Sequence, residues 1–260
     1  MPKKQIYIIV ILLFIILSSA IVGAEESSPK AKMILEKFFN KYEKLFSEGM
    51  KDTSSLMCKM SIKGVGRFET SKSSTNAPLL IDTKADLYAS NPNKMLLNLK
   101  GNMGNIIIII PDKKPISALT LFPDSKQFAT INISERIFGG LKPANRERFW
   151  RESILSYKGL INTTQGKAHK ILIKSTKPTV NEVTTIQILD GKWDPIRIEY
   201  SDPKSGSTTI DFDQIQFNPK IPPEKFIPNT RGYTQVSKEQ ITGIIMMNIM
   251  ASNMVKKPIK

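Results

Sequence analysis

The chain has 260 residues, of which 40% are hydrophobic and 23% are charged, with a formal net charge of +15. The single cysteine, Cys58, excludes an intramolecular disulfide, so stability has to come from the core. A basic chain favours anionic partners such as membrane surfaces or acidic proteins, although the scattered lysines are equally compatible with a solvated basic surface.

Residues 1–24 are typical of a secretory signal peptide. Lys3 and Lys4 supply positive charge, Ile6 to Leu17 is an unbroken apolar run, and small residues then predict cleavage after Ala24. An uncleaved anchor is the alternative, because apolar character continues past this run toward the ~18 residues that span a bilayer. Either outcome places the remainder outside the cytoplasm, predicted as periplasmic, and argues against a nucleic-acid partner. Loss of the two lysines would leave a net charge of +13.

The predicted mature chain begins with an amphipathic helix over residues 29–48. Apolar residues recur there at three- and four-residue spacing, while lysines and glutamates fill the other side. Pro29 suits the first turn of a helix and Gly49 suits its end.

Strand character dominates from residue 56 onward. Apolar runs with partial alternation are separated by short turn signals, and short links between successive strands indicate antiparallel hairpins. The predicted strands are residues 56–70, 81–89, 94–100, 105–111, 116–122, 127–133, 168–175, 182–189, 196–200 and 208–217.

Residues 133–160 interrupt this pattern, and the segment 144–157 is predicted to be helical. About ten antiparallel strands in one meander have to hide an apolar face. The predicted fold class is therefore mainly β (α+β): a curved antiparallel sheet that forms an incomplete barrel covered by α-helices. The predicted domain comprises residues 25–236, and residues 237–260 form an apolar and basic helical tail.

A curved apolar sheet under a movable helical cover is a ligand site by geometry, although the same side chains can simply fill a closed core. The strand residues predicted to line this hydrophobic cavity repeat with period two. They are Met95, Leu97, Leu99, Ile106, Ile108, Ile110, Leu119 and Leu121, and the predicted lid residues are Phe149, Trp150, Ile154 and Leu155.

Catalysis has little support in the sequence. His169 is the only histidine, so a two-histidine metal site cannot form in one chain, and a structural role is expected for this residue. No nucleophile elbow, Walker loop or dinucleotide fingerprint occurs. A glycosidase-like carboxylate pair has no spacing rule and stays open. We expect a protein that is not an enzyme and needs no cofactor or metal.

Two segments resemble the LolA-type periplasmic lipoprotein carriers and their LolB-like relatives. One is the strand and proline turn from Ala85 to Met95 (ADLYASNPNKM), and the other is the closing segment from Phe226 to Val236 (FIPNTRGYTQV). The resemblance covers roughly residues 29–236. It implies an incomplete antiparallel barrel lidded by helices, which carries acylated lipoproteins or lipids across the periplasm toward the outer membrane. Inner- and outer-membrane transfer proteins are the implied partners in this chaperone role in outer membrane biogenesis.

The resemblance also implies two site positions. In the carriers an arginine just before the proline of that turn latches the lid, and an aromatic residue three positions after the proline faces the cavity. The matching positions here are Asn91 and Met95. Asn91 lacks the donors of a guanidinium, whereas Met95 remains apolar and pliable.

Two questions stay open at the level of sequence. The same fold resembles that of lipoprotein-sensing regulators, so a sensing module that acts through a membrane-anchored protein is the alternative function. The tail has three possible locations: packed on the domain, docked in the domain's own cavity as a substitute ligand, or lying in a membrane interface.

Overall fold

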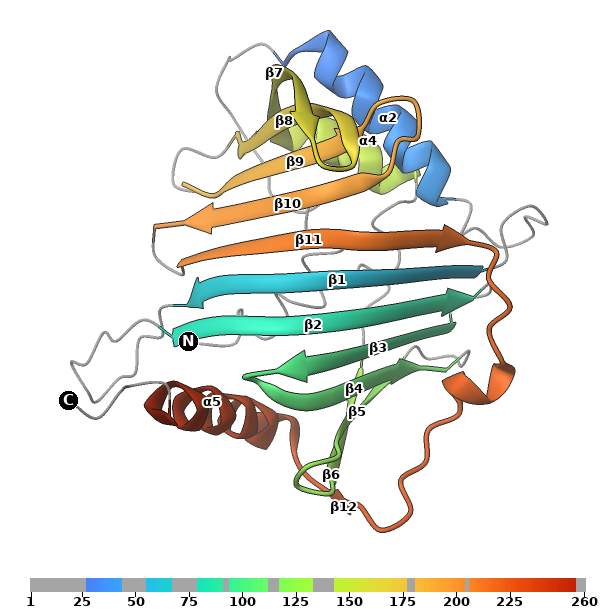
Figure 1. Cartoon of the computed structure of the whole chain (residues 1–260), viewed down its shortest axis with the longest axis vertical. Helices are drawn as coiled ribbons and strands as arrows, with labels where there is room; N and C mark the ends of the chain where they lie inside the picture. The colour runs from blue at the N-terminus through green and yellow to red at the C-terminus, as the bar shows by residue number, and fades with distance from the viewer. Residues whose placement is uncertain are drawn as a thin grey trace.

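The computed structural model describes residues 27–43, 55–66, 79–90, 94–111, 117–132, 143–176, 181–203 and 206–255. These residues form one twelve-stranded sheet with three α-helices and one short 3-10 helix (Figure 1). The predicted signal peptide and the position Asn91 lie outside the described residues. The strands are β1 (Ser55–Gly66), β2 (Leu79–Ser90), β3 (Lys94–Gly101), β4 (Gly104–Ile110), β5 (Ser117–Phe122), β6 (Gln127–Asn132), β7 (Ser153–Thr163), β8 (Gly166–Ser175), β9 (Val183–Leu189), β10 (Pro195–Asp202), β11 (Gly206–Phe217) and β12 (Thr234–Gln235).

The sheet consists of two antiparallel meanders, β1 to β6 and β7 to β11, which join because β1 pairs with β11. The order is β12-β6-β5-β4-β3-β2-β1-β11-β10-β9-β8-β7, and among these described strands only β12 runs parallel to its neighbour. The first and last strands in this order do not pair, so the sheet stays open. The predicted fold class, a curved and incomplete barrel, is confirmed.

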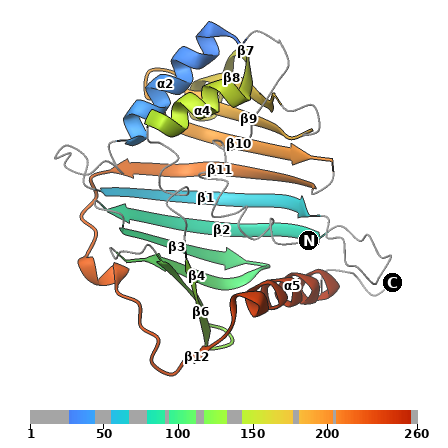
Figure 2. The same ribbon diagram turned by 180° about the vertical axis from the view of Figure 1, so that it is seen from behind.

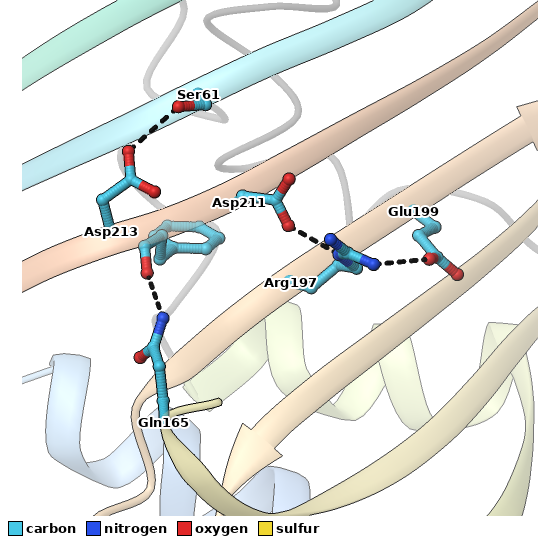
Figure 3. A network of polar contacts seen from close by, with 7 residues as sticks. Ser61, Gln165, Arg197, Glu199, Asp211 and Asp213 are labelled. Carbon is cyan, nitrogen blue, oxygen red and sulfur yellow. Dashed lines mark hydrogen bonds and ion pairs between the residues drawn. The ribbon is translucent and has the colours of Figure 1, made fainter. Parts of the chain in front are cut away.

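One end of the sheet curls tightly. Gln165, in the turn between β7 and β8, donates its side-chain amide to the carbonyl oxygen of Phe212 on β11 at 2.9 Å (Figure 3). Two strands separate β8 from β11, and at about 4.8 Å per strand a flat sheet would place them roughly 14 Å apart. The β7–β8 hairpin therefore folds back toward the centre of the sheet.

The two faces of the sheet differ in polarity. On β3, Met95, Leu97 and Leu99 are buried and alternate with partly exposed residues. We call the face that carries these residues the inner face, because its side chains form the main core. The outer face of β1, β10 and β11 carries charged and polar pairs, namely Ser61 with Asp213, and Arg197 with Asp211 and Glu199 (Figure 3).

Helices cover the inner face at both ends. Helices α2 (Pro29–Glu43) and α4 (Pro143–Glu152) lie over the β7 end, whereas α5 (Lys238–Val255) lies near the other end (Figures 1 and 2). Phe39 of α2, Phe149 of α4 and Ile245 of α5 all belong to the main core with the inner face. Within the described ranges, no helix has the length and apolar character needed to cross a membrane.

The predicted helix over residues 144–157 is wrong at its end. The helix stops at Glu152, and Ile154 and Leu155 already belong to β7, a strand that the sequence pattern missed. The spacing of the apolar residues from Phe149 onward is compatible with a continuing helix, which hides the start of the strand. In addition, the register shifts between Tyr157 and Gly159, which breaks the alternation typical of a strand.

Candidate functional site

Six of the eight predicted lining residues lie together on the inner face. Leu97 pairs directly with Ile108, so their side chains project from the same face of the sheet. Both side chains are buried, with exposed fractions of 1% and 8%. The other two cross-strand pairs on this face are Met95 with Ile110 and Leu99 with Ile106.

Leu119 and Leu121 lie on the opposite, outer face. They pair with Ile109 and Ile107, which alternate with the inner-face residue Ile108. The prediction for these two residues is therefore wrong. Its cause lies in β5 itself, where the large apolar residues Leu119 and Leu121 alternate with Ala118 and Thr120, so the pattern favours the leucines as the inward residues. The residues of β5 that do face inward are Ala118, Thr120 and Phe122.

Aromatic side chains join α2 to α4. Phe39 of α2 meets Phe149 edge-on and also contacts Trp150, each with a ring-centroid distance of 5.5 Å. Arg146 of α4 donates to the side-chain oxygen of Asn40 at 2.6 Å. The predicted lid residues Phe149 and Trp150 thus lie on a helix that covers the inner face. Leu155 is buried in the core but belongs to the sheet, and Ile154 is a partly exposed strand residue.

One carboxylate fastens the C-terminal end of α2 to the sheet. Asp194, which precedes β10, accepts a hydrogen bond from the Tyr42 hydroxyl at 2.8 Å and forms an ion pair with Lys41. Lys41 also donates to the carbonyl oxygen of Lys192 at 2.8 Å. Burial and the nearby carboxylate both raise the pKa of Tyr42 well above its ordinary value, so the hydroxyl stays protonated. We call Lys41, Tyr42 and Asp194 the latch.

The amino-acid sequence does not reveal this latch. The resemblance pointed to position 91, which lies outside the described residues. No sequence signal connects Tyr42 with Asp194, since they lie 152 residues apart and neither is unusual for a helix or a turn. The N-terminal end of α2 is held separately, because the backbone N–H of Ser28 donates to the carbonyl oxygen of Leu155 at 2.8 Å.

Cys58 lies on the inner face near the latch. It pairs with Leu87 on β2 and is 2% exposed. Burial raises the pKa of the thiol to about 12, and the carboxylates of Asp213, Asp194 and Asp86 add to the shift. The thiol is therefore protonated and unreactive at neutral pH, and behaves as a small apolar side chain.

His169 has a structural environment, as expected. Its Nδ1 lies 3.1 Å from the Tyr157 hydroxyl and its Nε2 lies 3.0 Å from Asp190. The ring stacks on Trp193, and the ammonium of Lys37 from α2 lies 4.4 Å from the centroid of the Trp193 ring. Both ring nitrogens thus have partners. Trp193, in the turn before β10, therefore lies next to α2.

Helix α5 places three isoleucines in the same core as the predicted lining residues. Ile241, Ile245 and Ile249 are 3%, 8% and 1% exposed. Asn248 on this helix donates to the carbonyl oxygen of Met103 at 3.0 Å. Helix α5, the described part of the tail, therefore packs against the domain, and it does so on the inner face.

Polar groups on the inner face are few. The hydroxyls of Thr83 and Thr120 are buried, and no hydrogen-bond partner reaches them among the described residues. In that part of the chain no cluster of three or more histidine, cysteine or acidic side chains is arranged to hold a metal ion. The inner face is thus an almost entirely apolar surface that carries two buried hydroxyls, for which the described residues supply no partner.

Comparison with known proteins establishes the fold. No protein-family model and no curated protein matches the chain. A conserved protein of uncharacterized function from Thermus thermophilus has a similar structure at 11% identity, with a TM-score of 0.50 over 80% of this chain and 99% of that one. This likeness shows a shared fold.

Two weaker likenesses involve named proteins. The MucA/MucB complex of Pseudomonas aeruginosa contains a chain that is 8% identical, with a TM-score of 0.47 over 80% of this chain and 63% of that one. A domain described as outer membrane lipoprotein-sorting, from Vibrio parahaemolyticus, is 8% identical, with a TM-score of 0.35 over 76% of this chain and 96% of that one.

Proposed function

We propose that this chain is an exported carrier that holds the acyl chain of a lipoprotein or lipid on its inner face, under the cover formed by α2 and α4. The observation that carries the proposal is that helices cover this apolar face and that one of them, α2, is held by a few side-chain contacts. The face is continuous across both meanders, while the C-terminal end of the covering helix α2 is fastened by a side-chain latch at Asp194. A latch of this kind can open without breaking the sheet.

The composition of the inner face supports an acyl ligand. Met60, Met95 and Met103 are each at most 2% exposed and lie in the same core as Leu97 and Ile108. Methionine is unbranched and polarizable, so it adapts to irregular apolar shapes and is frequent at binding surfaces that accept several partners. A flexible hydrocarbon chain needs such a surface rather than a rigid pocket of one shape.

The two buried threonine hydroxyls suggest where the polar end of the ligand lies. Thr83 and Thr120 project from β2 and β5 into an otherwise apolar surface. A buried hydroxyl without a partner is destabilising by about 1 to 3 kcal/mol. An ester or amide carbonyl of an acylated ligand would accept the missing hydrogen bond, so these threonines favour an acyl ester or amide over a plain hydrocarbon.

In this proposal the latch controls entry. Opening of α2 and α4 exposes the aromatic residues Phe39 and Phe149 together with the inner face, and an acyl chain then takes the place of the cover. Transfer of lipoproteins from inner-membrane to outer-membrane proteins is the specific role implied by the sequence resemblance.

The experiment is lipid extraction followed by a binding assay. Protein purified after export is extracted with organic solvent, and the extract is analysed by mass spectrometry for acyl chains. The delipidated protein is then titrated with a fluorescent fatty acid. We expect saturable binding that is competed by an acylated peptide. An empty extract together with no binding to the delipidated, folded protein would overturn the proposal.

A further inference from the structure

The sequence of α5 is unusual because it lacks charge. Residues 240–255 contain no lysine, arginine, aspartate or glutamate, although such residues make up 23% of the whole chain. A helix that is apolar all round is normally covered on every side. The surroundings of α5 do not meet this condition.

Only one side of α5 is covered by the described part of the domain. The buried stripe consists of the three isoleucines that face the core. On the other side, Met247 is 65% exposed and Met250 is 46% exposed. Gly243 and Ala251 are also exposed, and the spacing of three to four residues places all four on one outward stripe of the helix.

The exposed apolar residue Met33, in contrast, is surrounded by charged side chains. Met33 on α2 is exposed to a similar extent, 47%, but its neighbours on the helix include Lys30, Lys32, Lys37 and Glu36. Single apolar residues among charges are ordinary on protein surfaces. The outward stripe of α5 is instead an apolar surface without charge, which marks a site of interaction.

We infer that the outward stripe of α5 docks on an anionic membrane surface. The charge next to the helix identifies this occupant, because Lys256, Lys257 and Lys260 follow it directly in the sequence of a chain with net charge +15. Methionines that enter the interface, with lysines that meet anionic head groups, match the pattern of interfacial helices. A second copy of the chain carries the same positive charge and is repelled.

Docking through this stripe leaves the inner side of α5 packed on the sheet. The isoleucines remain in the core while the methionines enter the head-group region. The carrier would then meet the membrane with the edge of its inner face next to the bilayer, where an acyl chain leaves or enters. The docking surface is distinct from the ligand-binding face, so each can be tested without the other.

The test uses vesicle flotation with protein purified after export, its N-terminus determined by mass spectrometry. Vesicles contain either phosphatidylcholine alone or equal amounts of phosphatidylcholine and phosphatidylglycerol. The double variant Met247→Ser/Met250→Ser removes the stripe. The matched control is Met33→Ser/Leu80→Ser, which replaces two side chains of similar exposure, 47% and 52%, on other elements. All four substitutions are at exposed positions, and circular dichroism checks that each variant keeps its fold.

We expect the wild-type protein and the control to float with the anionic vesicles and not with the neutral ones. Binding should weaken in 1 M salt, where the Debye length falls to about 3 Å. The Met247→Ser/Met250→Ser variant should bind about tenfold less tightly, because two apolar side chains no longer enter the interface. Its affinity for a fluorescent fatty acid should be unchanged, which separates docking from the ligand-binding proposal.

Three results would overturn the inference. The first is wild-type protein that does not float with anionic vesicles. The second is equal flotation of the double variant and the wild-type protein, since docking would then occur elsewhere. The third is a wild-type dimer in light scattering that the double variant converts to a monomer without any vesicle binding, which would assign the stripe to a second copy of the chain.

Discussion

The hydroxyl of Tyr42 donates a hydrogen bond to the carboxylate of Asp194 at 2.8 Å, and this contact joins the covering helix α2 to the residue that precedes β10. The ring of Tyr42 also packs on Phe38 and Phe217. One side chain therefore connects the helix, the latch and the central strand β11. This arrangement allows the contribution of the hydrogen bond to be tested apart from the packing.

We expect Tyr42→Phe to loosen the cover without changing the core. The substitution keeps the ring and removes one hydrogen bond to a charged group, which contributes about 1.5 to 3 kcal/mol. The single thiol, Cys58, reports opening, because it is buried near Tyr42. Its alkylation rate in the folded protein should rise about tenfold. Tyr88→Phe on the outer face is the matched control, and equal rates in both variants would show that the latch does not restrain the cover.

Stability should fall in alkaline solution. Both Tyr42 and Cys58 have folded pKa values above their unfolded values, so each stabilises the folded state below its unfolded pKa and loses this contribution as the pH rises. For Cys58 the window runs from pH 9.0 to about 12. Within it the thiol makes the free energy of unfolding fall by up to about 1.4 kcal/mol per pH unit.

Urea denaturation at a series of pH values measures this effect. Cys58→Ala should flatten the fall in unfolding free energy above pH 9.0, in addition to a constant loss from the smaller side chain. Parallel profiles for the two proteins would contradict the assignment of a buried, protonated thiol.

Thr120→Val should weaken the binding of an acyl ester without lowering the stability of the protein. The valine has nearly the same shape and removes a buried hydroxyl for which the described residues supply no partner, so the free energy of unfolding should stay constant or rise by about 1 kcal/mol. Affinity for an acyl ester should fall several-fold, while affinity for a plain hydrocarbon should not. Isothermal calorimetry with both probes tests this, and equal affinity of the variant and the wild-type protein for the ester would exclude the hydroxyl from binding.

Both tryptophans should respond to ligand. Trp150 packs on Phe39 of α2, and Lys37 of the same helix lies over Trp193. A ligand that displaces α2 should therefore change the emission of Trp150 in the Trp193→Phe variant and of Trp193 in the Trp150→Phe variant. A response from Trp150 alone would show that α4 moves without α2.

The sequence predicted most of the fold because local patterns determine most of it. Ten of the strands and the helix α2 follow from apolar periodicity and turn residues, and short links require antiparallel pairing. The central pairing of β1 with β11 joins residues far apart in the chain, and no local pattern encodes it.

The candidate site was less predictable than the fold, because its residues depend on the face that each strand turns inward and on contacts between distant segments. Met95, Leu97 and Leu99 alternate with polar or less buried residues, so their face could be identified. On β5 the two leucines alternate with Ala118 and Thr120, so the pattern indicates the leucine face, whereas pairing with β4 turns Thr120 inward. The latch at Asp194 depends on a long-range contact between ordinary residue types.

In the proposed function, the inner face of the sheet binds an acyl chain. Leu96 and Leu97 on β3 provide a matched pair, because they are adjacent leucines that project to opposite faces. Leu97→Trp places a large ring on the inner face, whereas Leu96→Trp places the same ring on the outer face. Both variants are first checked for cooperative thermal unfolding, and Leu97→Met, which conserves volume, is added as a variant that should fold and bind normally.

The most direct measurement is titration of these proteins with a fluorescent fatty acid. We expect Leu97→Trp to lower affinity at least about tenfold, whereas Leu96→Trp and Leu97→Met should bind like the wild-type protein. Equal affinity in folded Leu97→Trp and Leu96→Trp proteins would show that the ligand does not bind on the inner face.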